Sequence, residues 1–215
     1  TALGSAHDPA VTIAMRTLLP FSGPATSALI GRTERLDAMG AAFVNAISAN
    51  LLDFDDTHPE TIIHPAAPVA APVIALAEAR KLPGRDVLTA FVLGVEVECR
   101  IGNAVSPQHY AAGWHITATC SVFGAAAATG KLLGLDAQRM TWALGIAGTQ
   151  SAGLREMFGS HCKSFHPGRA AQNGLSSALL AKANFTSSNQ VIEAKRGFAN
   201  TMSAKQDYKE ITEGL

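Results

Sequence analysis

The sequence has 215 residues, of which 47% are hydrophobic and only 16% are charged. The 17 Lys and Arg residues balance 17 Asp and Glu residues. This balance disfavours nucleic acid and anionic membranes as partners, because both require a basic excess. Abundant apolar surface with little charge favours a buried interface, and we expect a homodimer.

Apolar residues recur mostly at helical spacing, and the sequence predicts an all-α helical bundle without an internal repeat. Asp8, Asp37 and Asp136 each stand before such a segment, where an aspartate side chain caps the first turn. Gly134 follows one segment and is expected to end it. The predicted helices cover residues 9–19, 38–52, 65–81, 85–104, 115–133 and 166–183, with another after Asp136 and a short one at 190–200.

The remaining segments are predicted to be loops, over residues 1–9, 20–35, 106–113 and 151–165, and the pattern allows a brief strand at 26–30. The helix at 115–133 is rich in Ala, Gly, Ser and Thr. Such small side chains permit close backbone approach, so we expect this helix to be among the most buried. The polar segment 202–215 is expected to be partly disordered.

The cysteines Cys99, Cys120 and Cys162 are far apart and form no CxxC pair. The sequence therefore indicates neither a zinc site nor an iron–sulfur cluster. Scattered thiols favour a reducing compartment, and we expect a cytoplasmic protein. The longest apolar run, residues 65–77, contains prolines and is too short to span a bilayer, so no membrane association is expected.

The densest polar stretch is the junction between two predicted helices, residues 52–65, with three aspartates, two histidines and two threonines. Further polar clusters lie at residues 109–115, 161–163 and 166–169. Three of the four clusters directly precede a predicted helix, where free N–H groups and a partial positive charge bind carboxylate or phosphate. We therefore expect a site for a small polyanion that also holds a base.

Plainer interpretations of these clusters stay open. An acidic turn between helices is common, and a histidine at a helix start is more often a cap or a surface group than a catalyst. Asp53, Asp55 and Asp56 could chelate a divalent cation, although their spacing does not match a calcium loop. A metal-dependent hydrolase and a non-catalytic helical binding or dimerisation module are therefore alternatives to a cofactor-free enzyme.

Three motifs occur in order along the chain: residues 45–47 (NAI) leading to 52–57 (LDFDDT) and 64–65 (HP), then 113–115 (GWH), then 163–174 (KSFHPGRAAQNG). Together they resemble the signature of the MmgE/PrpD family of 2-methylcitrate dehydratases. The match runs from about residue 38 to residue 198. This family also includes cis-aconitate decarboxylase and iminodisuccinate epimerase. The resemblance implies proton transfer at carbon next to a carboxylate, with no metal and no organic cofactor.

The resemblance also implies site residues at the motif positions. The catalytic group comprises Asp53, His64, His115 and Lys163, and the substrate-binding group comprises Thr57, His166 and Arg169. Lys163 is expected to face the negative charge that grows during reaction, with the helix N-terminus predicted at His166. Proton transfer requires a base of near-neutral pKa, which favours His115 or His64 over Asp53. Asp53 would then orient an imidazole. Two histidines off the motif positions, His109 and His161, are expected to matter little for turnover.

Two departures from the family pattern stand near the first motif. Ile62 and Ile63 precede His64, and Ala66 follows Pro65, so the substrate pocket is expected to be retuned. Family members also carry a second, α+β domain that contributes to the site, and this chain is expected to lack it, together with the first helix. We divide the chain into an N-terminal helix and loop (1–36), a helical catalytic domain (37–200) and a polar tail that starts a linker to the missing domain (201–215).

The resulting hypothesis is a cofactor-independent lyase for a small di- or tricarboxylate, expected to be inactive as this fragment alone. Dehydration of a 2-methylcitrate-like substrate is the preferred reaction. Decarboxylation of cis-aconitate and epimerisation of iminodisuccinate are alternatives within the family.

Overall fold

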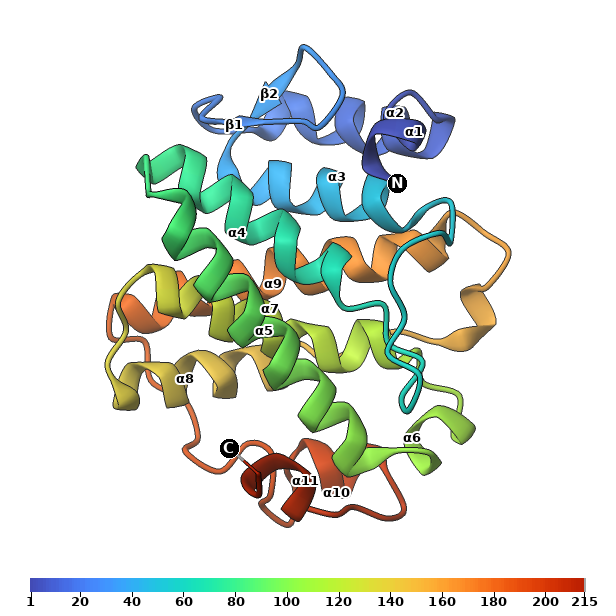
Figure 1. The fold of residues 1–215 in the computed structure, drawn as a ribbon, viewed down its shortest axis with the longest axis vertical. Helices are drawn as coiled ribbons and strands as arrows, with labels where there is room; N and C mark the ends of the chain where they lie inside the picture. The colour runs from blue at the N-terminus through green and yellow to red at the C-terminus, as the bar shows by residue number, and fades with distance from the viewer. Residues whose placement is uncertain (215) are drawn as a thin grey trace.

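Six helices form the body of the protein in the computed structural model, which describes residues 1–214 (Figure 1). They are α3 (Ala38–Asn50), α4 (Ala66–Arg80), α5 (Gly84–Val105), α7 (Ile116–Leu132), α8 (Ala137–Gly148) and α9 (Cys162–Lys182). The predicted all-α fold is confirmed. Over the described residues, the only sheet consists of β1 (Ser27–Ala28) and β2 (Arg35–Leu36), paired antiparallel with Ser27 opposite Leu36.

Short elements complete the chain: α1 (Ala2–Ser5), α2 (Pro9–Leu18), η1 (Leu19–Phe21), α6 (Gln108–Ala111), η2 (Arg155–Met157), α10 (Phe198–Met202) and α11 (Lys209–Thr212). Helical turns at α1, α6 and η2 thus lie in segments predicted to be loops. None of the helices in residues 1–214 combines the length and the hydropathy that crossing a bilayer requires.

The predicted helix at residues 190–200 is largely wrong, because α10 begins only at Phe198. The segment before it folds back on itself, with Phe198 N donating to Val191 O at 2.7 Å. Gly197 permits this turn, since a Cβ there would lie 2.5 Å from Val191 O. This segment therefore forms a compact turn, although its sequence pattern predicts a helix.

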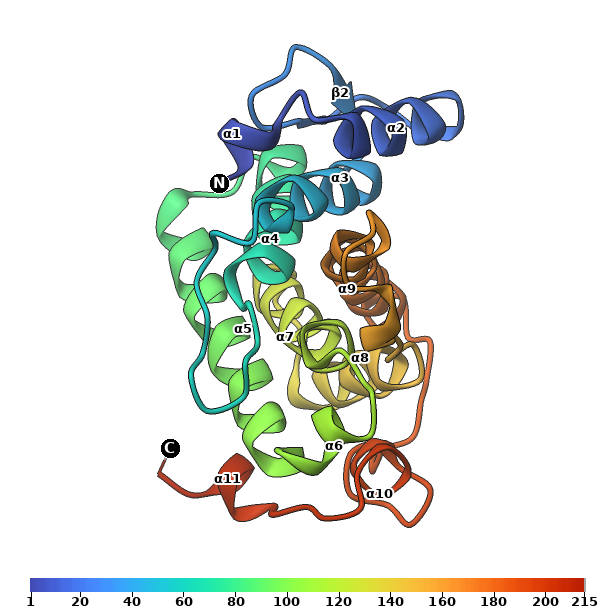
Figure 2. The same cartoon turned by 90° about the vertical axis from the view of Figure 1, so that its right-hand side faces the viewer.

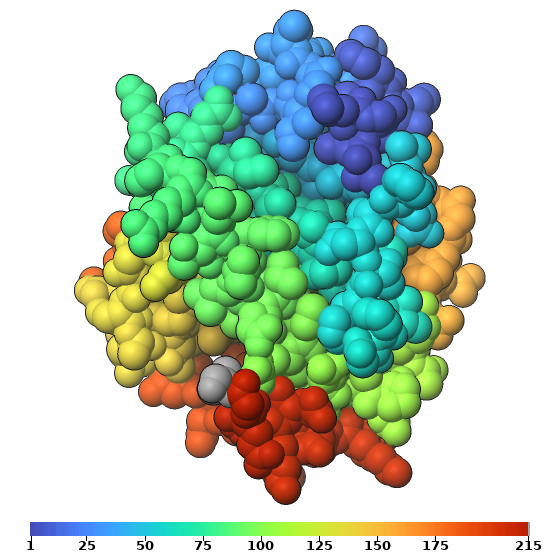
Figure 3. Space-filling view, viewed as in Figure 1, coloured from blue at the N-terminus to red at the C-terminus, as the bar shows by residue number. Residues whose placement is uncertain are grey.

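The polar tail packs against α5 instead of being disordered over its described residues (Figures 2 and 3). Asp207 N donates to Ala104 O at 2.8 Å, and the Arg100 guanidinium donates to Glu213 O at 2.8 Å. A guanidinium offers several donors in a fixed geometry, so one arginine can hold several carbonyls of the tail.

The aspartate caps are confirmed by hydrogen bonds. Asp8 accepts from Ala10 N at 2.8 Å, and Asp37 accepts from Met39 N and Gly40 N. Asp136 accepts from Arg139 N at 2.8 Å. Removing a cap of this kind costs about 1 kcal/mol. These local signals fix where α2, α3 and α8 begin.

Helix α9 begins at Cys162, four residues before the start predicted at His166. The prediction took Pro167 as a first-turn proline, but a proline inside a helix forfeits one backbone hydrogen bond and can be tolerated when packing compensates. Ser160 supports the earlier start, because its carbonyl accepts from Lys163 N at 3.1 Å and its hydroxyl from Cys162 N at 3.3 Å. Lys163 consequently lies in the first helical turn.

Helix α7 is the buried centre of the bundle, as its composition predicted. Every residue from Ile116 to Gly130 is buried, and the helix packs against α4, α5, α8 and α9 (Figure 2). It approaches α5 closely, where a Cβ added at Gly124 would lie 2.6 Å from Gly94 O. Two glycines therefore let the α5 and α7 backbones touch.

Glu98 is a carboxyl group buried between α5 and α7, with 0% exposure. Among the described residues, neither of its carboxyl oxygens has a hydrogen-bond partner. Burial raises the pKa of Glu98 well above its ordinary value, and the charge of Asp56 adds to this effect. The protonated form is therefore favoured in the folded state.

We expect Gly124→Ala to lower the free energy of unfolding by about 1–3 kcal/mol, because the new Cβ collides with the α5 backbone. Gly84→Ala is the matched control, since a Cβ there meets nothing within 4 Å. It should be neutral or stabilising by about 0.4–1 kcal/mol. Urea unfolding of both variants checks this, and equal midpoints would contradict the tight crossing.

We expect Glu98→Gln to become increasingly stabilising, relative to the wild type, as the pH rises. The folded-state pKa is raised, so wild-type stability falls as the pH climbs from the ordinary value of 4.5 towards the folded value. The advantage of the variant should grow by up to about 1.4 kcal/mol per pH unit in that window. Unfolding free energies at about pH 4.5 and about pH 7.5 test the slope, and a constant difference would refute it.

Candidate active site

The loop between α3 and α4, residues 51–65, carries the acidic junction and lies on the right in Figure 1. A turn closes it, with Ile62 N donating to His58 O at 2.8 Å and His58 N to Ile63 O at 2.9 Å. Asp53 and Ile62 have φ values of +53° and +63°. Left-handed backbone is tolerated by aspartate but is an outlier for a β-branched residue.

Two contacts hold the junction loop against the helices. His64 N donates to the Thr117 hydroxyl at 3.1 Å, which fixes the loop to the first turn of α7. The Asp56 carboxylate accepts from Ala66 N at 3.2 Å and so caps the start of α4. The position of the His64 ring therefore depends on the placement of α7.

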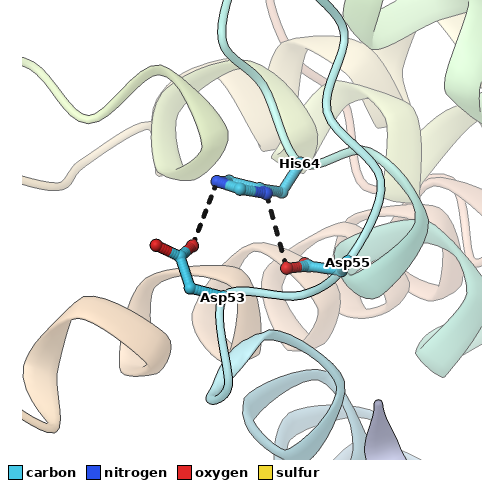
Figure 4. Close-up of side chains that lie close together, drawn as sticks. All are labelled: Asp53, Asp55 and His64. Carbon is cyan, nitrogen blue, oxygen red and sulfur yellow. Dashed lines mark ion pairs between the residues drawn. The ribbon is translucent and has the colours of Figure 1, made fainter.

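The His64 ring lies between two carboxylates (Figure 4). Its Nδ1 is 3.4 Å from Asp55 Oδ1, and its Nε2 is 3.5 Å from Asp53 Oδ1. The contact with Asp55 raises the pKa of His64, against the opposing effect of burial. Burial works to raise the pKa of Asp55, but the contacts with His64 and Asn50 prevail and lower it. The charged form of this pair is therefore favoured. Thr57 Oγ1 lies 3.4 Å from His64 Nδ1.

Lys163 connects α9 to the junction loop. Its ammonium group donates to Asp53 Oδ1, the same oxygen that lies near His64. The Lys163 side chain is mostly buried and the Asp53 side chain mostly exposed. Asp53 thus faces two groups that can carry positive charge, Lys163 and His64. An anion bound in this place would contact the same two groups.

His115 stands at the N-terminal end of α7 and contacts His166 of α9. Their Nδ1 atoms are 2.8 Å apart, and the rings of His115 and Phe158 are nearly perpendicular, with centroids 4.9 Å apart. Burial, followed by nearby positive groups including Lys163, lowers the pKa of His115 to about 3. Burial also lowers the pKa of His166. Both rings are therefore neutral near pH 7, with one Nδ1 donating and the other accepting.

The four predicted catalytic residues line one cavity of about 240 Å³, which we call the Asp53 cavity. Its walls are Asp53, Ile62, His64, Tyr110, His115, Phe158, Gly159 and Lys163. Cations, neutral imidazole and carboxylate thus face one small space. Such an arrangement can bind a small anion and move a proton at the same place.

The three predicted substrate-binding residues are more scattered. Thr57 touches His64 at the edge of the junction loop, and His166 stands behind His115. Arg169 lies elsewhere, with His166 on a second cavity of about 480 Å³, which we call the Arg169 cavity. Its guanidinium donates to Gln172 Oε1 at 2.5 Å. Arg169 is therefore not placed at the Asp53 cavity.

A metal ion is the main competing occupant of the junction. Donor atoms of Asp53, Asp55 and His64 all lie within 4.8 Å of one another, a grouping that could hold a cation. The Lys163 ammonium already contacts Asp53 Oδ1, and a divalent ion there would meet its repulsion. We interpret the three residues as a charge network that positions an imidazole.

Sequence reasoning missed several members of the site. Asp55, whose side chain is 5% exposed and accepts from Asn50 Nδ2 at 2.9 Å, contacts His64 at 3.4 Å, about as closely as the predicted Asp53 does at 3.5 Å. Tyr110 and Phe158 form walls of the cavity. Only Asp55 carried a signal, because it alternates with Asp53 in the same acidic motif.

His109 is a buried, hydrogen-bonded residue of the fold, which its position in the sequence did not indicate. It is 0% exposed, with Nδ1 at 3.0 Å from Met202 O and Nε2 at 2.7 Å from the Thr119 hydroxyl. His161, by contrast, is exposed. Replacing His109 would therefore disturb the fold, and His161 is the better control for studies of turnover.

Comparison with known proteins adds a family assignment. A family model described as the MmgE/PrpD N-terminal domain matches residues 1–211. A cis-aconitate decarboxylase of Aspergillus terreus is 34% identical over 190 residues, which cover 85% of this chain and 39% of that protein. The cis-aconitate decarboxylase of Homo sapiens is 34% identical over 185 residues, covering 83% and 38%. The chain thus spans about two fifths of the length of the curated relatives it matches.

We expect Asp55→Asn to lower the pKa of His64 towards the ordinary value of about 6.5, because the contact that favours the charged imidazole is weakened. Glu60→Gln is the matched control, since this exposed acid of the same loop pairs with His58 at 3.3 Å. NMR titration of the His64 ring protons measures the change. An unaltered His64 pKa in Asp55→Asn would rule out the assigned partner.

Proposed function

The chain belongs to the MmgE/PrpD family, and we propose that it forms part of a cofactor-independent lyase that acts on a small polycarboxylate. Decarboxylation of a cis-aconitate-like substrate is the favoured reaction, because the relatives named above are cis-aconitate decarboxylases. Dehydration of a 2-methylcitrate-like substrate, the reaction preferred from sequence, stays a prediction. So do the homodimer, the cytoplasmic location and the second domain.

The convergence of Asp53, His64, His115 and Lys163 on one cavity is the observation that carries this proposal. Helices α7 and α9 also begin at this cavity, with His115 before the first residue of one and Lys163 in the first turn of the other. Their N-terminal ends add partial positive charge. A non-catalytic dimerisation module would give no reason for these groups to meet.

The chemistry of decarboxylation explains why a cation is needed. When the carbon–carbon bond to the departing CO₂ breaks, its electron pair passes into the neighbouring unsaturated acid and makes an enediolate-like anion. Lys163 is the fixed cation of the cavity and faces that charge as it grows, in part released from Asp53 by the incoming carboxylates. The carbon must then receive a proton to complete the product.

The two histidines of the cavity have different roles, one in binding the substrate and one in moving the proton. His64, whose charged form is favoured by the contact with Asp55, pairs with a substrate carboxylate. His115 is neutral in the empty cavity because burial and nearby cations lower its pKa to about 3. A bound polyanion offsets those cations, so the proton affinity of His115 rises when substrate is present. His115 is therefore the group that moves the proton.

We expect Lys163→Ala and His115→Ala each to lose about 100-fold or more in kcat, the usual effect of deleting a charge stabiliser or a proton-transfer group. His161→Ala, an exposed histidine near Lys163, should retain wild-type turnover. Steady-state kinetics of the intact protein with cis-aconitate, with CO₂ release as the readout, checks the ranking. Near-wild-type activity in Lys163→Ala, or equal losses in all three variants, would refute these roles.

A further inference from the structure

The contact between His115 and His166 joins two separate cavities. His115 lines the Asp53 cavity, and His166 lines the Arg169 cavity. The two residues are 2% and 6% exposed, so each ring is enclosed apart from the cavity it lines. Because Nδ1 of each ring is engaged with the other at 2.8 Å, Nε2 is the nitrogen that each has left for its own cavity.

We propose that His115 and His166 form a proton relay that carries a proton from the Arg169 cavity into the Asp53 cavity. The inference rests on the proposed function, because decarboxylation consumes one proton in every turnover whereas dehydration and epimerisation do not. A neutral imidazole holds one N–H and one lone pair. Two such rings joined through Nδ1 can therefore pass a proton by exchanging tautomers.

The transfer starts with the proton of His115 on Nε2 and the proton of His166 on Nδ1. Once CO₂ has left, the enediolate-like anion takes the Nε2 proton of His115 at carbon, and the electron pair of that anion forms the new C–H bond. The Nδ1 proton of His166 moves to Nδ1 of His115, and a solvent acid in the Arg169 cavity protonates Nε2 of His166. After product release, water entering the Asp53 cavity protonates Nε2 of His115, and the Nδ1 proton of His115 returns to Nδ1 of His166. Nε2 of His166 then releases its proton to solvent in the Arg169 cavity, which restores the starting tautomers.

The surroundings of His115 favour such a path. Burial, and after it neighbouring groups that include Lys163, His64 and Arg155, lower the pKa of His115, so the ring holds no extra proton in the empty site. A bound polycarboxylate fills the Asp53 cavity and displaces its water, which removes the direct solvent supply of protons. The His166 side stays connected to the other cavity, so the proton can arrive while the substrate is enclosed.

The joined rings can be tested first without any turnover. In the intact wild-type protein labelled with ¹⁵N-histidine, we expect a scalar coupling across the hydrogen bond between the Nδ1 atoms of His115 and His166. One Nδ1 should be protonated and the other unprotonated. Two rings whose Nδ1 atoms both exchange freely with water would overturn the relay, whatever the reaction proves to be.

Kinetics then tests the function of the relay. His166→Asn keeps an amide near the position of Nδ1, which can hydrogen-bond to His115 but cannot pass a proton on. We expect kcat for cis-aconitate to fall about 100-fold with KM unchanged, and added imidazole to restore much of the lost rate. Met157→Leu, which alters an apolar wall of the same cavity, should keep the wild-type kcat.

The outcomes separate the two proposals. A wild-type kcat in His166→Asn, or a loss that imidazole does not restore in a folded variant, would overturn the relay while leaving the lyase proposal standing. If the intact wild-type protein releases no CO₂ from cis-aconitate, the proposed function fails, and the NMR coupling still decides whether the two rings are joined.

Discussion

The close crossing of α5 and α7 is the constraint on which the rest of the structure depends. Gly94 and Gly124 bring the two backbones into contact, and this crossing is possible only because neither residue has a side chain. The placement of α7 then sets His115 at its N-terminal end and Thr117 in its first turn, where the Thr117 hydroxyl holds the backbone of His64. The geometry of the site is thus determined by packing in the core.

In the empty cavity, the negatively charged side chains are paired with groups that can be positive. Asp53 and Asp55 face Lys163 and His64, and each carboxylate touches a group that can be positive. Replacing water by a polyanion shifts that balance, because the substrate brings carboxylates of its own. The neighbouring neutral pair responds to such a shift, since the charges near His115 add to burial in lowering its pKa.

Local sequence signals predicted the scaffold well, because caps and composition act over short distances. Asp37 as an N-cap and the burial of α7 follow from neighbouring residues alone. The motifs also predicted Lys163 as a site residue, and it lines the Asp53 cavity. The partnership of Asp55 with His64 depends instead on the left-handed backbone at Asp53, and the remote place of Arg169 depends on where α9 begins. The remote place of Arg169 in particular is three-dimensional geometry that leaves no mark in a single sequence.

Ile62 shows how the size of the cavity and the stability of the fold are coupled at one residue. Its φ of +63° is costly for a β-branched side chain, by about 1–3 kcal/mol, and yet its side chain forms part of the cavity wall. Glycine or asparagine would suit this backbone better and would also open the cavity. A substitution at this one loop position can therefore enlarge the volume available to a substrate and stabilise the fold at the same time. The helical core keeps its shape.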